Sequence, residues 1–286
     1  PGPPPPPAPH HPPHAAPHLN TSAERTPSTF LHPVALKSHP VTETPPRGWL
    51  LRDEHTDQAL ARLKFFKEQG AIAVIIGQTG LGKSSLLRLF IHELPQNRYQ
   101  PLYLHLTPLN ANAFLRLIVI KLVENPKLGK DRMLLQILER IHQNDKCTLF
   151  IIDEAHLIDP KTLTDLRLLI SSIEQEISLK ILLCGQENLS RILKRASHAD
   201  LAHRISLQFI MRPLSNQKTA AYIDDRITKA GGSSKIFEPE AKDLIHDYTG
   251  GVPRQINNVA TACLINAAAR SLNKITEPLV HETMAE

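Results

Sequence analysis

From residue 53 onwards, the apolar residues of the chain alternate between two patterns. Residues 53–70 show helical spacing, because Ala59, Leu60, Leu63 and Phe66 recur on one face. The second pattern is a short continuous apolar run, which is typical of a strand buried on both faces. The five runs are Ala71–Ile76, Leu102–Leu106, Thr148–Asp153, Leu179–Cys184 and Ser206–Met211. Runs separated by helical stretches predict an α/β fold, with a parallel five-stranded sheet covered by helices.

The strand-like runs stop after Pro213. Helical spacing continues over about 215–230, 238–248, 253–270 and 277–284. We therefore expect an α/β domain over residues 47–212 and a small all-helical domain over residues 213–286.

The first 46 residues have a different composition. They hold 15 of the 24 prolines, and residues 1–20 contain no Lys, Arg, Asp or Glu. Such a segment cannot offset the entropy cost of ordering, so we predict a disordered Pro/His-rich arm and linker over residues 1–46. Whether this arm is a tether or binds a partner stays open.

Charge and cysteine content narrow the class of protein. The formal net charge is +5 and the pI is near 9.1, which fits contact with nucleic acid without requiring it. No apolar run approaches the roughly 20 residues of a membrane span. The three cysteines are widely spaced, which is typical of free thiols in a reducing compartment. We expect a cytoplasmic protein that does not contact a membrane.

A phosphate-binding motif follows the first predicted strand. The pattern G-x-x-x-x-G-K-[ST] is matched in full by Gly77, Gln78, Thr79, Gly80, Leu81, Gly82, Lys83 and Ser84. Ser85 comes directly after the motif. Glycines let the loop curl so that backbone N–H groups face a phosphate at the start of a helix. Lys83 would contact the β- and γ-phosphates, and Ser84 would offer its hydroxyl to Mg²⁺. The motif predicts that the chain binds ATP with Mg²⁺.

Two carboxylates end the third apolar run. Asp153 at the end of this strand would hold the Mg²⁺, directly or through water, and Glu154 would polarise the attacking water as a general base. The letters Asp153-Glu154-Ala155-His156 also spell a helicase box. No second recombinase-like core accompanies it, so the sequence argues against a helicase.

The order of motifs over residues 47–286 resembles that of AAA+ ATPases of the ExeA, TniB, TnsC and MuB type. The matching segments are GQTGLGKSSLLRLF, TLFIIDEAHLI, DLRLLISSIE, ILLCGQENL, LAHRISLQF, PLS and GGVPRQINNVATACLINA. The resemblance implies a P-loop AAA+ core followed by a helical lid. It also implies ATP hydrolysis that depends on assembly into a homo-oligomer, either a ring or a helical filament.

The resemblance assigns further site residues. It implies that Gln186 senses the γ-phosphate, that Arg204 is an arginine finger for a neighbouring subunit, and that Arg254 is the sensor arginine of the lid. Trp49 and Leu50 would form part of the adenine pocket. Other roles stay open for these residues. Gln186 would otherwise cap the next helix. Arg204 would otherwise be a surface residue, and Arg195 in the same region is then the competing candidate for the arginine finger. Arg254 would otherwise pair with a lid carboxylate.

The family has two branches. One serves secretion and joins this core to a membrane span and a cell-wall-binding domain, neither of which is seen in this sequence. The other contains transposition regulators that polymerise on double-stranded DNA and recruit or activate a transposase. In those regulators the region between the two nucleotide motifs contacts DNA, and the basic residues found there are Arg116, Lys121, Lys127, Lys130 and Arg132. They would neutralise phosphates without reading sequence, or they would form a charged helix face in water.

The sequence therefore predicts an ATPase that assembles on duplex DNA with little sequence preference and regulates transposition through a transposase. Three alternatives stay open. They are a secretion-type ATPase without its membrane module, a nucleotide switch that does not hydrolyse ATP, and a replication-initiator or helicase-loader type of protein.

Overall fold

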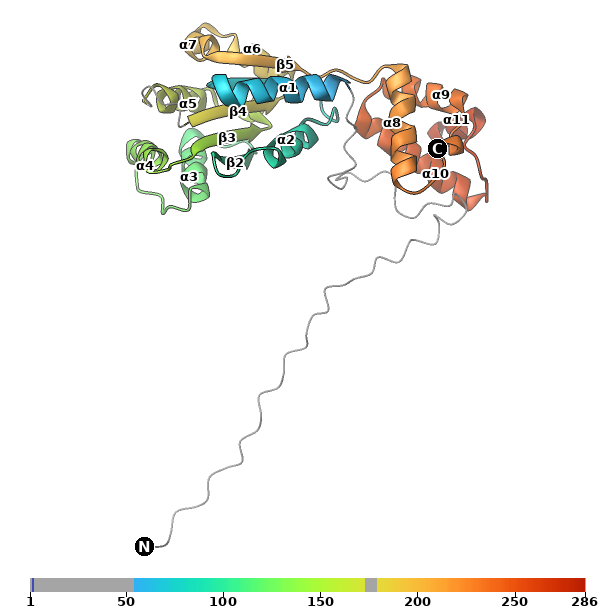
Figure 1. Ribbon diagram of the computed structural model, residues 1–286, viewed down its shortest axis with the longest axis horizontal. Coiled ribbons are helices and arrows are strands. Elements are labelled where there is room, and N and C mark those ends of the chain that lie inside the picture. Colours follow the sequence, from blue (N-terminus) through green and yellow to red (C-terminus); the bar gives the residue numbers. More distant parts are fainter. Residues whose placement is uncertain (1, 3–53, 173–178, 286) are drawn as a thin grey trace.

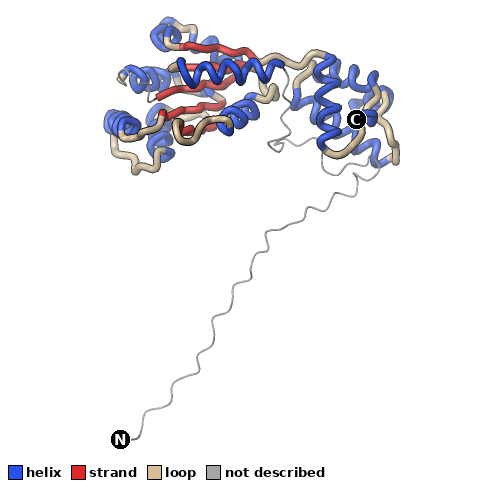
Figure 2. The backbone as a smooth tube through the Cα atoms, viewed as in Figure 1, coloured by secondary structure: helices blue, strands red, loops and turns tan. Residues whose placement is uncertain are grey.

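The computed structural model describes residues 54–172 and 179–285, together with Gly2. The predicted arm (apart from Gly2), Trp49 and Leu50 lie outside these residues. Within them, an α/β body is followed by a group of helices (Figures 1 and 2). The fold is the predicted one, a parallel five-stranded sheet covered by helices and followed by a C-terminal helical region.

A parallel sheet forms the centre of the α/β body. Its strands are β1 (Ile72–Ile76), β2 (Tyr99–His105), β3 (Cys147–Asp153), β4 (Leu179–Gly185) and β5 (Ile205–Ile210). Their order across the sheet is β2-β3-β4-β1-β5, and every pairing is parallel. Strands β1, β3 and β4 are buried almost throughout, which explains their continuous apolar runs.

Strand β2 begins three residues before the predicted start at Leu102. Tyr99, Gln100 and Pro101 continue the strand because they pair in register with the first three residues of β3. Gln100 and Pro101 are half-buried at this edge of the sheet, so no apolar run marks them. The apolar pattern therefore missed the first three residues of the strand, although Tyr99 is buried.

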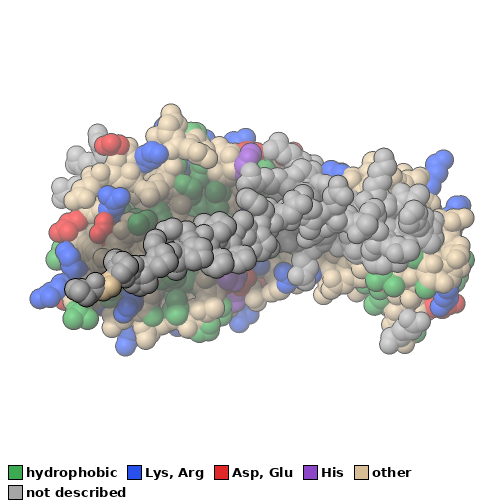
Figure 3. Space-filling view, turned by 90° about the horizontal axis from the view of Figure 1, so that it is seen from below, with side chains coloured by type: hydrophobic (Ala, Val, Ile, Leu, Met, Phe, Trp, Pro, Cys, Tyr) green, Lys and Arg blue, Asp and Glu red, His purple; other side chains and the backbone are tan. Residues whose placement is uncertain are grey.

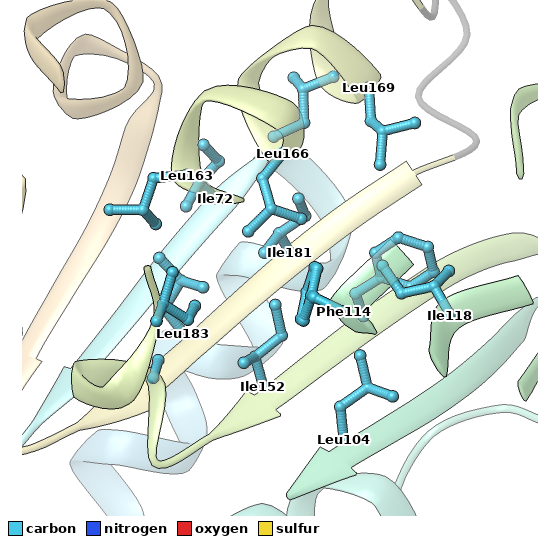
Figure 4. Packing of buried hydrophobic residues seen from close by; sticks show 14 of the residues in the cluster. Ile72, Leu104, Phe114, Ile118, Ile152, Leu163, Leu166, Leu169, Ile181 and Leu183 are labelled. Carbon is cyan, nitrogen blue, oxygen red and sulfur yellow. The ribbon is translucent and has the colours of Figure 1, made fainter. Parts of the chain in front are cut away.

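Helices cover both faces of the sheet. One face packs against α1 (Glu54–Gln69) and α2 (Lys83–His92). The opposite face packs against α3 (Ala111–Lys121), α4 (Lys130–His142) and α5 (Pro160–Ser171). Figure 4 shows this second cluster, in which Leu166 of α5 and Phe114 of α3 lie against side chains of β4, including Ile181. Shorter helices lie towards β5: α6 (Glu187–Leu193), a 3₁₀ turn (Ala196–His198) and α7 (Ala199–His203).

The helices after Pro213 have their own apolar cluster. They are α8 (Asn216–Lys229), a 3₁₀ turn (Ser234–Ile236), α9 (Pro239–Thr249), α10 (Pro253–Ala269) and α11 (Glu277–Ala285). Tyr222 and Ile223 of α8, Ile245 of α9 and Cys263 of α10 are buried in this cluster. We refer to α8–α11 as the lid helices. Figure 1 shows them grouped at one end of the α/β body.

A glycine turn brings the start of α10 to the phosphate motif. Gly250 and Gly251 have positive φ values of 55° and 73°. A Cβ atom on Gly251 would lie 1.9 Å from the carbonyl oxygen of Leu214, so only glycine fits this close approach. The turn places Arg254 so that its backbone N–H donates to the carbonyl oxygen of Gly80 at 3.2 Å. The lid helices therefore contact the loop predicted to bind phosphate.

Among the helices that the structure describes, none is both long enough and apolar enough to cross a membrane.

Candidate nucleotide site

The phosphate motif forms a curled loop between β1 and α2. Gly77 continues from the buried strand and donates its N–H to the carbonyl oxygen of Gly185. Gly80 and Gly82 have φ values of +88° and +89°, which L side chains rarely adopt. The first turn of α2 has no acidic residue and no side-chain cap. Its free N–H groups and the positive end of its dipole therefore suit an anion.

Lys83, the first residue of α2, lies inside this curl. Its side chain is buried, and Nζ donates to the carbonyl oxygens of Gly77 at 2.8 Å and Gln78 at 2.9 Å. Both acceptors are backbone atoms of the loop itself, so the ammonium group is held where a phosphate would enter. Leu81 is buried and anchors the loop, Gln78 and Thr79 are exposed, and Ser85 is half-buried on the first turn of α2.

Asp153 lies at the carboxyl end of β3 and is completely buried. Its Oδ2 accepts hydrogen bonds from Ser84 Oγ at 2.7 Å and from Tyr103 Oη at 2.6 Å. Its Oδ1 accepts the backbone N–H of Glu154 at 3.0 Å. A buried carboxylate beside a serine hydroxyl is a set of hard oxygen donors, which fits Mg²⁺. The two predicted metal ligands are thus within hydrogen-bond distance of each other.

Tyr103 was missed by the sequence analysis. It lies on β2, opposite Ile151 of β3 and two residues before the pair His105 and Asp153. Burial, followed by the hydrogen bond to the Asp153 carboxylate, raises the pKa of the Tyr103 hydroxyl, which therefore stays protonated and donates. Only the adjacency of β2 and β3 brings it to Asp153, and strand order is not visible in the sequence.

Glu154 follows Asp153 in a left-handed backbone conformation, with a φ of 57°. This turn starts a 3₁₀ turn, Ala155–Leu157, and the Glu154 side chain is about one quarter exposed. Its Oε2 lies 3.3 Å from Nδ1 of His156. A partly exposed carboxylate next to the buried Asp153 has access to water and can take a proton from it.

Gln186 begins α6, directly after β4. Its side chain makes no hydrogen bond that caps the helix, so the structure does not support the capping role that the sequence left open. Its backbone N–H donates instead to His156 Nδ1 at 3.4 Å. The side chain of Gln186, which is half-buried, is therefore not occupied by the cap.

The three arginines lie in different places. Arg254 is exposed on the first turn of α10, where its backbone contacts Gly80 of the phosphate loop. In the part of the chain that the structure describes, no ion pair joins Arg254 to a lid carboxylate. Arg204 is exposed at the end of α7, directly before the edge strand β5. Its competitor Arg195 is also exposed, at the start of the 3₁₀ turn before α7.

The basic residues between the two motifs lie around the α3–α4 connection. Arg116, Lys121, Lys127 and Arg132 are exposed. Lys130 is half-buried and its Nζ lies 2.6 Å from Oδ1 of Asp165, a buried carboxylate of α5, so this charge is already neutralised within the fold. On the face in Figure 3, the described Lys and Arg side chains are spread out and do not form one continuous patch.

Among residues 54–172 and 179–285, no group of three or more His, Cys, Asp or Glu side chains is arranged to hold a metal ion. Cys147, Cys184 and Cys263 are free thiols.

The nucleotide-site segment resembles a known protein family. Residues 67–193 match the family model described as "AAA domain". The match spans Lys83, Ser84, Asp153 and Glu154, so the segment that builds the site is similar to this family.

Known proteins and structures are similar over most of the chain. General secretion pathway protein A of Aeromonas hydrophila is 29% identical over 251 residues, which are 84% of this chain and 45% of that protein. The chain thus spans less than half the length of this relative. The Aeropyrum pernix ORC1 protein in complex with DNA matches with a TM-score of 0.61 and 14% identity, over 84% of this chain and 68% of that one. Drosophila ORC bound to DNA matches with a TM-score of 0.66 and 15% identity, over 97% and 69%. At these identities, the two structures show the fold alone.

Proposed function

We propose that this protein is an AAA-domain ATPase that assembles with copies of itself and, when bound to ATP, holds duplex DNA to regulate transposition. The observation that carries the proposal is the connected set of Lys83 in the loop, Ser84 hydrogen-bonded to Asp153, and Glu154 beside them.

The phosphates of ATP bind the loop N–H groups and the start of α2, and the Lys83 ammonium contacts the β- and γ-phosphates. Ser84 and Asp153 hold Mg²⁺, which supplies positive charge to the phosphate oxygens. Glu154 takes a proton from the attacking water, and Gln186 contacts the γ-phosphate. Hydrolysis resets the assembly and does no chemistry on DNA.

Assembly completes the site. Arg204 is exposed at the end of α7 and enters the nucleotide site of a neighbouring subunit, where its charge stabilises the transition state. Arg254 acts within its own subunit, which its contact with Gly80 supports. Trp49 and Leu50 complete the adenine pocket. A single subunit is therefore slow, and turnover rises with assembly.

DNA binding rests on charge. The exposed residues Arg116, Lys121, Lys127 and Arg132 neutralise DNA phosphates, which carries no sequence preference. A similar fold is found in ORC structures determined with DNA, which supports DNA as the ligand. The DNA-bound assembly then recruits or activates a transposase.

The experiment is fluorescence anisotropy on random-sequence duplex with ATP, with ADP and without nucleotide, at two salt concentrations. Binding that requires ATP, weakens with salt and tolerates any sequence is the expected result. Glu154→Gln is expected to stay bound to DNA with ATP, because it binds but does not hydrolyse. Its matched control, Lys83→Ala, loses the phosphate contact and should bind neither ATP nor DNA. Absence of DNA binding under every nucleotide condition contradicts the DNA part of the proposal.

A second candidate function is an ATPase of a secretion pathway. The similarity to General secretion pathway protein A favours it, because that relative matches 84% of this chain. The nucleotide chemistry is the same in both candidates. For a secretion ATPase we expect ATP turnover that DNA does not stimulate. Measuring turnover with and without duplex DNA therefore separates the two candidate functions.

A further inference from the structure

His156 lies between the two groups that the proposed hydrolysis uses at the γ-phosphate. It is the second residue of the 3₁₀ turn that follows Glu154. Its Nδ1 lies 3.3 Å from Oε2 of Glu154, and the same atom accepts the backbone N–H of Gln186 at 3.4 Å. The side chain of His156 is only 12% exposed.

The two segments pack closely at this point. A Cβ atom on Gly185, the last residue of β4, would lie 3.0 Å from the backbone nitrogen of His156. The 3₁₀ turn is closed by the Leu157 N–H, which donates to the carbonyl oxygen of Glu154 at 2.9 Å. The turn after β3 and the end of β4 therefore touch at His156. A movement of Gln186 would change the contacts of the His156 ring.

One nitrogen atom cannot serve both partners. To accept the N–H of Gln186, Nδ1 needs its lone pair, so the ring proton must be on Nε2. To bind the carboxylate of Glu154, Nδ1 must carry the proton and donate it. The two hydrogen bonds exclude each other. In the structure, the Gln186 N–H is directed at Nδ1 with an N to Nδ1 distance of 3.4 Å, and Oε2 of Glu154 lies 3.3 Å from the same atom.

We propose that His156 is a positioning residue that couples Gln186 to Glu154. When Gln186 moves towards the γ-phosphate, its backbone N–H no longer donates to Nδ1 of His156. Nδ1 then takes up a proton, and Nε2 releases its proton to water. Nδ1–H then donates to Oε2 of Glu154, which leaves Oε1 turned to the attacking water. The base is aligned only after ATP has been sensed. This inference rests on the proposed ATPase function and gives a role to His156, which that function left without one.

The first test compares three variants by steady-state ATP turnover. His156→Ala removes both hydrogen bonds and should lower kcat about 10- to 100-fold, the range for groups that orient a reacting group. The KM for ATP should change little, because no contact with the phosphates is lost. His156→Asn places an amide at the position of Nδ1 and should restore most of kcat. His156→Gln places its amide at the position of Nε2 and should resemble His156→Ala. Equal rates for the Asn and Gln variants, or an unchanged kcat in His156→Ala, overturn the proposal.

A second test asks whether His156 acts through Glu154. In a Glu154→Gln background, His156→Ala should cause little further loss of kcat, because the group it positions is already gone. A purely structural defect lowers kcat by the same factor in both backgrounds. That additive result overturns the proposal.

The third test does not depend on hydrolysis. The ¹⁵N chemical shifts of the His156 ring report which nitrogen carries the proton. We expect an unprotonated Nδ1 without nucleotide and a protonated Nδ1 with a non-hydrolysable ATP analogue. If the wild-type protein shows no turnover, the proposed ATPase function fails, and this measurement still decides the inference. A tautomer that is the same in both states overturns it.

Discussion

Ser84 and Asp153 are 69 positions apart in the chain, yet Ser84 Oγ donates to Asp153 Oδ2 at 2.7 Å. Ser84 follows strand β1 and the phosphate loop, and Asp153 lies at the carboxyl end of β3. These strands are not neighbours, since β4 lies between them. The pair is therefore a product of the sheet order, and it supports a magnesium site at the carboxyl end of the sheet.

Tyr103 is expected to orient Asp153 for the metal. Its hydroxyl donates to Asp153 Oδ2 at 2.6 Å, and burial keeps that hydroxyl protonated. Tyr103→Phe removes one hydrogen bond and leaves the ring in place. Groups that orient a metal ligand typically contribute 10- to 100-fold to metal affinity. We expect the Mg²⁺ concentration for half-maximal ATP turnover to rise by about this factor.

Tyr99→Phe is the matched control for this prediction. It removes a hydroxyl from the same strand, but that hydroxyl donates to the carbonyl oxygen of Lys67, far from Asp153 along the strand. The control should leave the Mg²⁺ requirement unchanged. Equal Mg²⁺ requirements for the two variants would show that the Tyr103 hydroxyl does not act on the metal site.

Gly80→Ala should weaken nucleotide binding by separating α10 from the phosphate loop. A Cβ atom at Gly80 would lie 3.0 Å from Arg254 Cβ and from Val252 Cγ1, on a backbone with a φ of +88°. Gly129→Ala is the control, since its φ is +96° but no atom lies within 4 Å of the added Cβ. Both should lose stability because L residues rarely adopt a positive φ, by about 1–3 kcal/mol, and Gly129 has in addition a ψ of 141°, which is nearly exclusive to glycine at positive φ.

The two glycine variants are compared by thermal unfolding and by titration with an ATP analogue. Only Gly80→Ala should also lower the affinity for the analogue, because it disturbs the Arg254 N–H bond to Gly80. If Gly80→Ala binds the analogue as tightly as Gly129→Ala does, the contact between α10 and the loop is not needed for nucleotide binding.

Cys263 in the lid helices should make stability depend on alkaline pH. Burial raises the pKa of its thiol to about 11, from an ordinary value of 9.0. Between these two values the unfolded chain loses the thiol proton and the folded chain keeps it. The unfolded state then binds fewer protons, so the free energy of unfolding falls as pH rises. Below about pH 9 the contribution of the thiol is complete.

The measurement is urea unfolding at several pH values from about 8 to 11. Cys263→Ala is the control, because it shares every other titrating group. The wild-type protein should lose more stability over this range than the variant does, by a few kcal/mol at most, since one pKa unit corresponds to about 1.4 kcal/mol. Parallel curves for the two proteins would contradict the prediction.

The apolar pattern predicted the buried elements well because burial on both faces leaves a continuous signal. All five residues of β1 are buried, and its predicted and observed bounds differ by one residue. The local motif also predicted Lys83 and Ser84, because their geometry depends on one loop. Contacts between distant elements could not be predicted in this way. Tyr103 reaches Asp153 only because β2 lies beside β3, and His156 reaches Gln186 only because a turn packs against the end of β4.

Lys130 illustrates the same limit for charge. In the sequence it is one of several basic residues between the two motifs, and it was included among the candidates for DNA contact. In the structure α4 packs near α5, and Lys130 Nζ lies 2.6 Å from the buried carboxylate of Asp165. The other four candidates are exposed. Sequence alone does not separate a lysine that pairs with a buried acid from one that faces water.

Lys130→Ala should therefore act on stability more than on DNA binding. It leaves Asp165 buried without its cation, and breaking a buried pair costs about 3–5 kcal/mol. Because Lys130 itself is 39% exposed, we expect a smaller loss, about 1–3 kcal/mol. Arg132→Ala, two residues away and exposed, is the control, and it should keep stability and weaken DNA binding. The free energy of unfolding in urea and the anisotropy of labelled duplex are measured for both. A stable Lys130→Ala protein that has lost DNA binding would return Lys130 to the DNA-contacting residues, because its charge would then act outside the fold.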